Sequence, residues 1–304
     1  MTTKGGSRAG VISRVVSYGK FAQALEMISR VHNLARDQLG VGAFLLGEPG
    51  VGKTTCIREY ERQFNSANTP LEDSKPIIRI EFTKRTSVNS MLRAFIVAMG
   101  GEPHSRATED QLLFQCARLI ANLKVSLVFI DEAQNLISGR SGSDPAGVFD
   151  TLKSLMNNSN ISIVMSGLPV VNEVFNHLPS QQRDLKRRFK HSIELTAFSM
   201  GCPDDFKRFA EGILKETELD EELMDNGVFL TALMLASKGN QYEFVSLVLQ
   251  AIEERASNSK FITNACFDRA YKSFSSDKSP FKMTREEIKA GLAQIETLRP
   301  KNGS

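Results

Sequence analysis

Short runs of apolar residues alternate, along the first two thirds of the chain, with longer segments in which apolar residues recur every three or four positions. A short apolar run predicts a buried strand, and the longer spacing predicts an amphipathic helix. The predicted strands cover 41–46, 76–82, 125–130, 161–167 and 192–195. The predicted helices cover 18–39, 56–64, 88–99, 108–123, 148–156 and 170–176. Because helices separate the strands, we expect an α/β fold with a largely parallel sheet sandwiched by helices.

The pattern changes after Gly201-Cys202-Pro203, and every later segment is typical of a helix. These segments cover 203–216, 228–237, 241–256 and 264–274, and a capping box at Thr284 opens a last helix. We therefore predict a flexible basic arm over 1–17, an α/β domain over 18–200, a small all-helical domain over 201–275, and a basic tail with a short helix over 276–304.

A glycine-rich stretch follows the first predicted strand and leads into a helix-compatible segment. It fits the pattern G-x-x-x-x-G-K-[ST] without a mismatch, and its flanks are those of a phosphate-binding loop. Glycines let backbone amides turn toward a triphosphate, and the helix that follows adds its positive end. Lys53 would hold the outer phosphates, and the hydroxyl of Thr54 would bind Mg²⁺. The residues predicted to bind ATP are Gly47, Pro49, Gly50, Val51, Gly52, Lys53, Thr54 and Thr55.

A second motif lies at 125–134, where four apolar residues, Leu127 to Ile130, are followed by two acids. A buried strand that delivers acids at its carboxyl end fits the Walker B element of ATPases. Asp131 would hold Mg²⁺, mostly through water ligands, and Glu132 would polarise the attacking water. Together the two motifs predict an ATPase that uses ATP and Mg²⁺.

Composition adds few constraints. The chain of 304 residues has a formal net charge of +3, and its basic residues gather toward the two ends. Basic tails fit either solvated arms or contacts with nucleic acid and partner proteins. The four cysteines are far apart in sequence, which favours reduced thiols over a metal site. We expect no membrane span or signal peptide, and hence a cytoplasmic protein.

Taken together, the motifs resemble those of AAA+ ATPases, over about residues 20–275. The resemblance implies that Ser166 is the sensor 1 residue and that the helical domain is a lid. The segment before the last strand resembles an arginine-finger segment, in which Arg188 would reach ATP held by a neighbouring subunit; Arg187 and Arg183 are alternatives. The usual sensor 2 arginine is absent, and Lys238 is the residue that could replace it.

Within AAA+ proteins, the chain resembles the TniB/TnsC transposition regulators, which are relatives of MuB. The resemblance rests on the chain length, on 131–136, on 166–169 and on the short lid. It implies an ATP-dependent helical or ring homo-oligomer on double-stranded DNA, linking a target-selection protein to the transposase. Lys84, Arg85 and Thr86 would contact DNA, although a solvated loop, in which Thr86 and Ser87 cap the next helix, fits as well.

Two other functions fit the same motifs. A helicase-loading AAA+ ATPase would bind a hexameric helicase and prefer single-stranded DNA. A secretion or assembly ATPase of the ExeA type would bind no DNA, and such proteins usually carry a membrane segment.

Overall fold

A computed structural model describes residues 8–37, 39–68, 73–84, 86–137, 145–178, 183–255, 259 and 261–298. Its contacts divide the chain into two compact units. The sheet unit comprises 20–49 and 53–195, and the helical unit comprises Met1–Gly19, Gly50–Gly52 and Thr196–Ser304. Each unit is described separately below.

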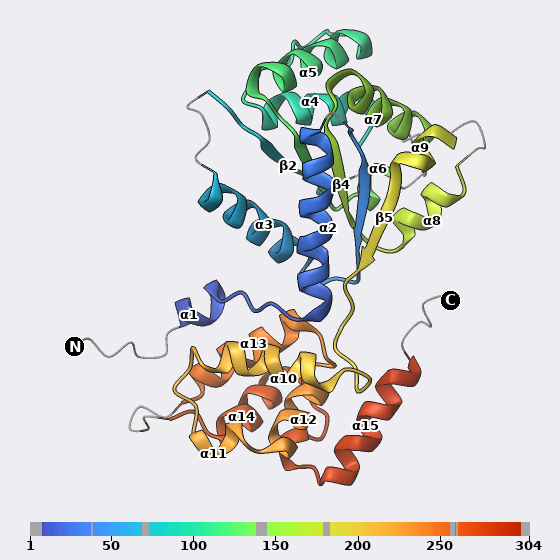
Figure 1. Ribbon diagram of the computed structural model, residues 1–304. Helices are drawn as coiled ribbons and strands as arrows, with labels where there is room; N and C mark the ends of the chain where they lie inside the picture. Colours follow the sequence, from blue (N-terminus) through green and yellow to red (C-terminus); the bar gives the residue numbers. More distant parts are fainter. Residues whose placement is uncertain are drawn as a thin grey trace. The chain divides into compact units, whose positions relative to one another are not determined.

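The sheet unit is built on five strands, and the predicted parallel sheet is confirmed (Figure 1). The strand order is β2-β3-β4-β1-β5, and every neighbouring pair is parallel. The strands are β1 (Gly42–Leu46), β2 (Ile77–Glu81), β3 (Leu127–Asp131), β4 (Ser162–Gly167) and β5 (Phe189–Glu194). Parallel strands end at a common edge, so the residues that follow β1, β3 and β4 come together there.

Helices cover both faces of the sheet, as predicted. They are α2 (Gly19–Arg36), α3 (Lys53–Ala67), α4 (Val88–Ala98), α5 (Glu109–Leu123), α6 (Gln134–Ile137), α7 (Pro145–Ser159), α8 (Val170–Asn176) and α9 (Arg183–Arg188). Side chains of α4 to α8 share one core with Phe44 and Ile130. The opposite face receives α3, where the ring of Tyr60 lies 6.2 Å from that of Phe129. The three central strands are buried along their whole length, which explains their continuous apolar runs.

The last strand begins at Phe189, three residues earlier than the predicted start at Ser192. The strand lies at the edge of the sheet, beside β1 alone. An edge strand tolerates charged side chains, and Lys190 is exposed. Because Lys190 is charged, the apolar pattern of the sequence does not show that the strand begins before Ser192.

The helical unit contains α10 (Pro203–Leu214), α11 (Glu221–Met224), α12 (Gly227–Ala236), α13 (Gln241–Glu253) and α14 (Asn264–Phe274). A 3-10 turn at Pro280–Lys282 and helix α15 (Arg285–Leu298) belong to the same unit. Part of the segment predicted as a flexible arm also folds here: α1 (Arg8–Ser13) buries Val11, and Arg14 lies 3.5 Å from Glu216. Residues 1–7 of that arm lie outside the described residues.

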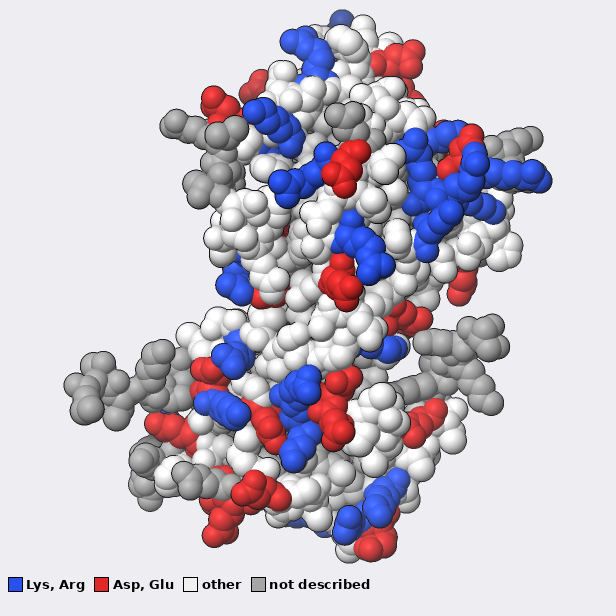
Figure 2. Space-filling model, viewed as in Figure 1, with Lys and Arg blue, Asp and Glu red and all other residues white. Residues whose placement is uncertain are grey.

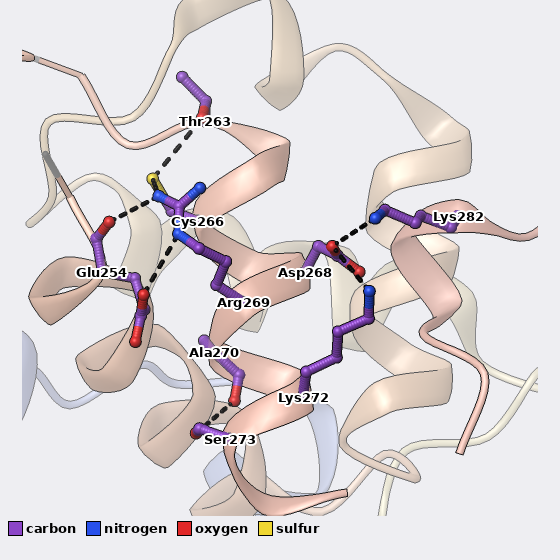
Figure 3. A network of polar contacts seen from close by, with 9 residues as sticks. All are labelled: Glu254, Thr263, Cys266, Asp268, Arg269, Ala270, Lys272, Ser273 and Lys282. Carbon is purple, nitrogen blue, oxygen red and sulfur yellow. Dashed lines mark hydrogen bonds and ion pairs between the residues drawn. The ribbon is translucent and has the colours of Figure 1, made fainter. Parts of the chain in front are cut away.

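Ion pairs and hydrogen bonds join α14 to its neighbours in the helical unit (Figure 3). Asp268 on α14 is only 7% exposed, and its carboxylate lies 2.9 Å from Lys282 and 3.4 Å from Lys272. On the same helix, Arg269 donates hydrogen bonds to the side chain and the backbone carbonyl of Glu254. These contacts bind the 3-10 turn and the end of α13 to α14, so that the segment after 275 is part of the packed unit.

Candidate nucleotide-binding site

The phosphate-loop motif lies between β1 and α3, as the sequence predicts. Gly50 and Gly52 have φ values of +81° and +90°, a region that side chains with a Cβ avoid. Lys53 opens α3 and is 7% exposed. Its Nζ donates hydrogen bonds to the carbonyls of Gly47 at 2.7 Å and of Glu48 at 3.0 Å. The lysine is therefore held inside the loop that it would share with a phosphate.

Two opposed effects act on the Lys53 ammonium group. Burial lowers its pKa, while the carboxylates of Glu132, Asp131 and Glu48 raise it; the net direction is downward. A buried cation that is only partly compensated by nearby carboxylates gains from an anionic ligand. A triphosphate would supply that compensation.

The two predicted magnesium ligands lie together. Thr54 Oγ1 donates a hydrogen bond of 2.9 Å to Asp131 Oδ2, across 77 positions of sequence. Asp131 ends β3 and is only 2% exposed. A hydroxyl beside a carboxylate is a pair of hard oxygen ligands, which would suit Mg²⁺. The arrangement fits both ATP and the metal.

Glu132 is fixed by a contact that sequence reasoning missed. The residue has a φ of +53°, and its backbone N–H donates to Asp131 Oδ1 at 3.1 Å. Gln134 donates its side-chain amide to the Glu132 carboxylate and accepts, at 3.2 Å, the N–H of Leu168 after β4. The acid is thus positioned by a side chain that spans two strand ends. Gln134 is the last residue of the second motif, 125–134, but its contacts depend on tertiary structure.

Ser166 lies at the same edge, on β4. It is fully buried, pairs with Leu45 of β1, and its carbonyl accepts the N–H of Ala133 at 2.9 Å. Within the described part of the chain its hydroxyl has no hydrogen-bond partner. A buried hydroxyl without a partner is costly. Its assignment as a sensor stays a prediction.

The loop predicted to contact DNA is joined to the Walker B turn. Asn135 donates to the carbonyl of Phe82 at 2.5 Å, and its own carbonyl accepts the N–H of Thr86 at 3.2 Å. Lys84 is exposed, and Thr86 Oγ1 donates to the Lys84 carbonyl at 2.8 Å. Ser87, rather than Thr86, caps α4. Arg85 lies outside the described residues.

The three candidate arginine fingers differ in their contacts. Arg188, the first choice from sequence, donates to the carbonyl of Gly40 at 2.8 Å and to Asn157 Oδ1 at 2.6 Å. Arg187 is 74% exposed and pairs with Asp184, and Arg183 is exposed. All three belong to α9, before the amino end of β5, and so lie at the sheet edge opposite the phosphate loop.

The remaining predictions concern Lys238, the cysteines, metal clusters and membrane spans. Lys238 precedes α13 in the helical unit with a φ of +52°, and its role as a sensor stays a prediction. The four cysteines are free thiols. In the described ranges, no group of three or more His, Cys, Asp or Glu side chains could hold a metal ion. No helix in those ranges is both long and apolar enough to cross a membrane.

One protein-family model matches part of the chain. Residues 41–175 match the family model of the AAA domain, which covers both ATPase motifs. A comparison of the sequence with curated proteins gives no match.

Solved structures extend the likeness to the fold of the whole chain. The chain is similar to Cdc6p from Pyrobaculum aerophilum, with a TM-score of 0.66 and 16% identity over 94% of this chain and 74% of that one. It is also similar to the ORC2 protein of Aeropyrum pernix in ADPNP–ADP complexes (TM-score 0.65, 14% identity, 84% and 68% coverage). A third likeness is to Drosophila ORC bound to DNA (TM-score 0.59, 15% identity, 96% and 76% coverage). Residues 41–175 therefore match the AAA domain model, and the chain has the P-loop AAA+ fold.

Proposed function

We propose that this protein is an ATP-dependent, DNA-binding AAA+ regulator of DNA transposition. It would oligomerise on duplex target DNA and link a target-selection protein to the transposase. The observation that carries the nucleotide part is the bond between Thr54 and Asp131, beside the buried Lys53. The transposition part rests on the resemblance of the motifs to the TniB/TnsC regulators.

Each residue of the site has a distinct task in ATP hydrolysis. Lys53 and the loop amides would bind the phosphates, and Thr54 with Asp131 would hold Mg²⁺, which would supply positive charge beside them. Glu132, positioned by Gln134, orients and polarises the attacking water. Hydrolysis would be slow and would serve to take the oligomer apart.

The position of the arginines supports their action on a neighbour. Arg188 bonds to Gly40, before the amino end of β1, whereas the phosphate loop follows its carboxyl end. A strand of five residues separates the two edges by about 16 Å at ~3.3 Å per residue. The arginine therefore does not serve its own nucleotide, and in an oligomer it, or Arg187 or Arg183, would complete the site of the adjacent copy.

The DNA contact is proposed for Lys84, Arg85 and Thr86. A lysine and an arginine in a loop suit backbone phosphates and would read no bases. Asn135 forms hydrogen bonds to both ends of this loop, so a change in the turn on ATP binding would alter the position of the residues proposed to contact DNA.

The test is a gel shift of wild type and Lys53→Ala with duplex or single-stranded DNA, each with ATP, ADP or no nucleotide. The proposal expects ATP-dependent, duplex-preferring complexes that Lys53→Ala does not form. A preference for single-stranded DNA would instead indicate a helicase loader. Absence of DNA binding under all conditions would indicate an assembly ATPase of another kind.

A further inference from the structure

A basic groove lies on the sheet unit, away from the ATPase motifs. It has a volume of about 530 Å³. Its lining comes from the segment before β1, from α7 and from α9: Leu39, Gly40, Val41, Lys153, Asn157, Asn160, Asp184, Arg187 and Arg188. Lys and Arg side chains gather on the side of this unit that carries α9 and β5 (Figure 2). We call this feature the α7–α9 groove.

Arg188 forms a fixed wall of the α7–α9 groove. One terminal nitrogen donates to Gly40 and the other to Asn157. A guanidinium has five N–H donors, so this geometry holds the group in place and leaves donors over. Gly40 packs closely on the backbone after α7, because a Cβ there would lie 2.5 Å from the carbonyl of Ile161. The wall is therefore ordered before any ligand arrives.

The charge of the groove is positive. Its lining carries three cations, Lys153, Arg187 and Arg188, against one carboxylate, that of Asp184. Asp184 already pairs with Arg187 on its own helix. The basic character continues past the groove, since 183–190 contains five Lys and Arg and only that one acid. Arg183 and Lys190 are exposed.

The remaining polar side chains of the lining are amides. Asn157 and Asn160 are both exposed, and an amide can donate to an anionic oxygen. Guanidinium, ammonium and amide donors are the groups that contact the phosphates of nucleic-acid backbones. An arginine fork in particular matches phosphate geometry. Two further exposed cations outside the groove lining, Arg183 and Lys190, suit a polymer with several phosphates better than a single small anion.

We propose that the α7–α9 groove and the adjacent basic residues bind the phosphate backbone of nucleic acid. In the nucleotide-free protein, where these arginines do not serve a neighbouring nucleotide site, one phosphate would enter the groove between Lys153, Arg187 and Arg188. Its neighbours would lie over Arg183 and Lys190. This contact reads no bases and needs no ATP. It is separate from the proposed loop at 84–86, so it adds a second nucleic-acid surface to the molecule.

The test measures duplex binding by nucleotide-free protein, using fluorescence anisotropy over a range of salt concentrations. The variant is Lys153→Glu/Arg187→Glu, and its matched control is Arg285→Glu/Lys289→Glu, two exposed residues of α15. We expect the groove variant to lose at least about tenfold in affinity, with a salt slope shallower by about two. The salt slope of the control should differ from that of wild type by less than about one.

Two results would overturn the inference. The first is that the groove variant and its control have equal duplex affinity and an equal dependence of affinity on salt. The second is that polyglutamate displaces the duplex as efficiently as unlabelled DNA of equal charge. The variant Lys153→Gln/Arg187→Gln, which adds no carboxylates, guards against a folding defect and is expected to show the same direction. The outcome is independent of the proposed function. DNA can bind to the groove without ATP even if the protein does not assemble with ATP. If Lys84→Glu loses duplex binding and the groove variant does not, the result would support the proposed DNA-binding loop and contradict the groove as a nucleic-acid surface.

Discussion

Asn135 donates a 2.5 Å hydrogen bond to the backbone carbonyl of Phe82, and so joins the turn after β3 to the loop after β2. The N–H of Thr86 returns a bond of 3.2 Å to the Asn135 carbonyl. The same turn contains Glu132, whose carboxylate raises the pKa of Lys53 against the effect of burial, and Gln134, which donates to that carboxylate. A change in that turn on ATP binding would therefore be felt by the loop proposed to contact DNA.

The first prediction removes this link. Asn135→Ala should bind ATP within about twofold of wild type, yet the gain in duplex affinity that ATP produces should fall by about fivefold or more, a typical coupling between sites. Anisotropy of a labelled duplex, titrated with and without ATP, measures both quantities. Asn158→Ala, an exposed asparagine of α7, is the control. An unchanged ATP effect in Asn135→Ala would show that the coupling runs elsewhere.

The second prediction concerns the magnesium ligands. Thr54→Ala and Asp131→Asn should each reduce the gain in nucleotide affinity on adding Mg²⁺ by about tenfold or more, because a bond to a charged group contributes about 1.5–3 kcal/mol. Titration of a fluorescent ATP analogue with Mg²⁺ or with a chelator measures this gain. Thr231→Ala, a half-buried threonine of α12, should behave as wild type. A full Mg²⁺ effect in Asp131→Asn would remove this residue from the site.

A third prediction separates hydrolysis from binding. Glu132→Gln should lower the steady-state ATPase rate by about a hundredfold, the usual effect of losing a general base. Gln134→Ala should lower it by about tenfold, because the carboxylate loses the amide that positions it. ATP affinity should change less than about twofold in both. If Gln134→Ala hydrolyses ATP at the wild-type rate, the amide has no positioning role.

The fourth prediction is a pH dependence of stability. His32 is 1% exposed, between Tyr60 OH at 2.9 Å and Ser126 Oγ at 2.7 Å. Burial, with a smaller contribution from Arg36, lowers its pKa from 6.5 to about 4. Between these values the unfolded chain binds the proton and the folded chain does not, so stability falls as pH drops from about 6.5 to 4. The loss attributable to His32 is at most about 3 kcal/mol.

Urea unfolding at several pH values tests this dependence. Other carboxylates titrate in the same range, so the quantity of interest is the difference between wild type and variant. His32→Gln should be less stable than wild type at neutral pH, and that gap should narrow toward pH 4. His104→Gln, at an exposed position, should run parallel to wild type. A constant gap between wild type and His32→Gln would contradict the lowered pKa.

Much of the fold could be predicted because its elements are long and periodic. The central strands are continuous apolar runs, and α4 begins at Val88 and α5 ends at Leu123, as the pattern indicates. The short helices α1, α6 and α11 were not predicted, since four to six residues contain too few repeats to show a period. Their existence depends on packing and caps.

Those parts of the candidate site whose residues are contiguous in sequence could be predicted. Lys53 and Thr54 stand in one motif and Asp131 and Glu132 in another, and the parallel sheet brings the motifs together. The bonds of Gln134 and Asn135 join segments that are distant in sequence, so no local pattern reveals them. The bond from Arg188 to Gly40, across 148 positions, is hidden for the same reason.

The most direct test of the central claim is electron microscopy of the purified protein with long duplex DNA and a slowly hydrolysed ATP analogue. The account predicts regular oligomers along the duplex with the analogue, and none with ADP or with Lys53→Ala. A wild-type protein that stays monomeric with every combination of nucleotide and duplex would contradict the account.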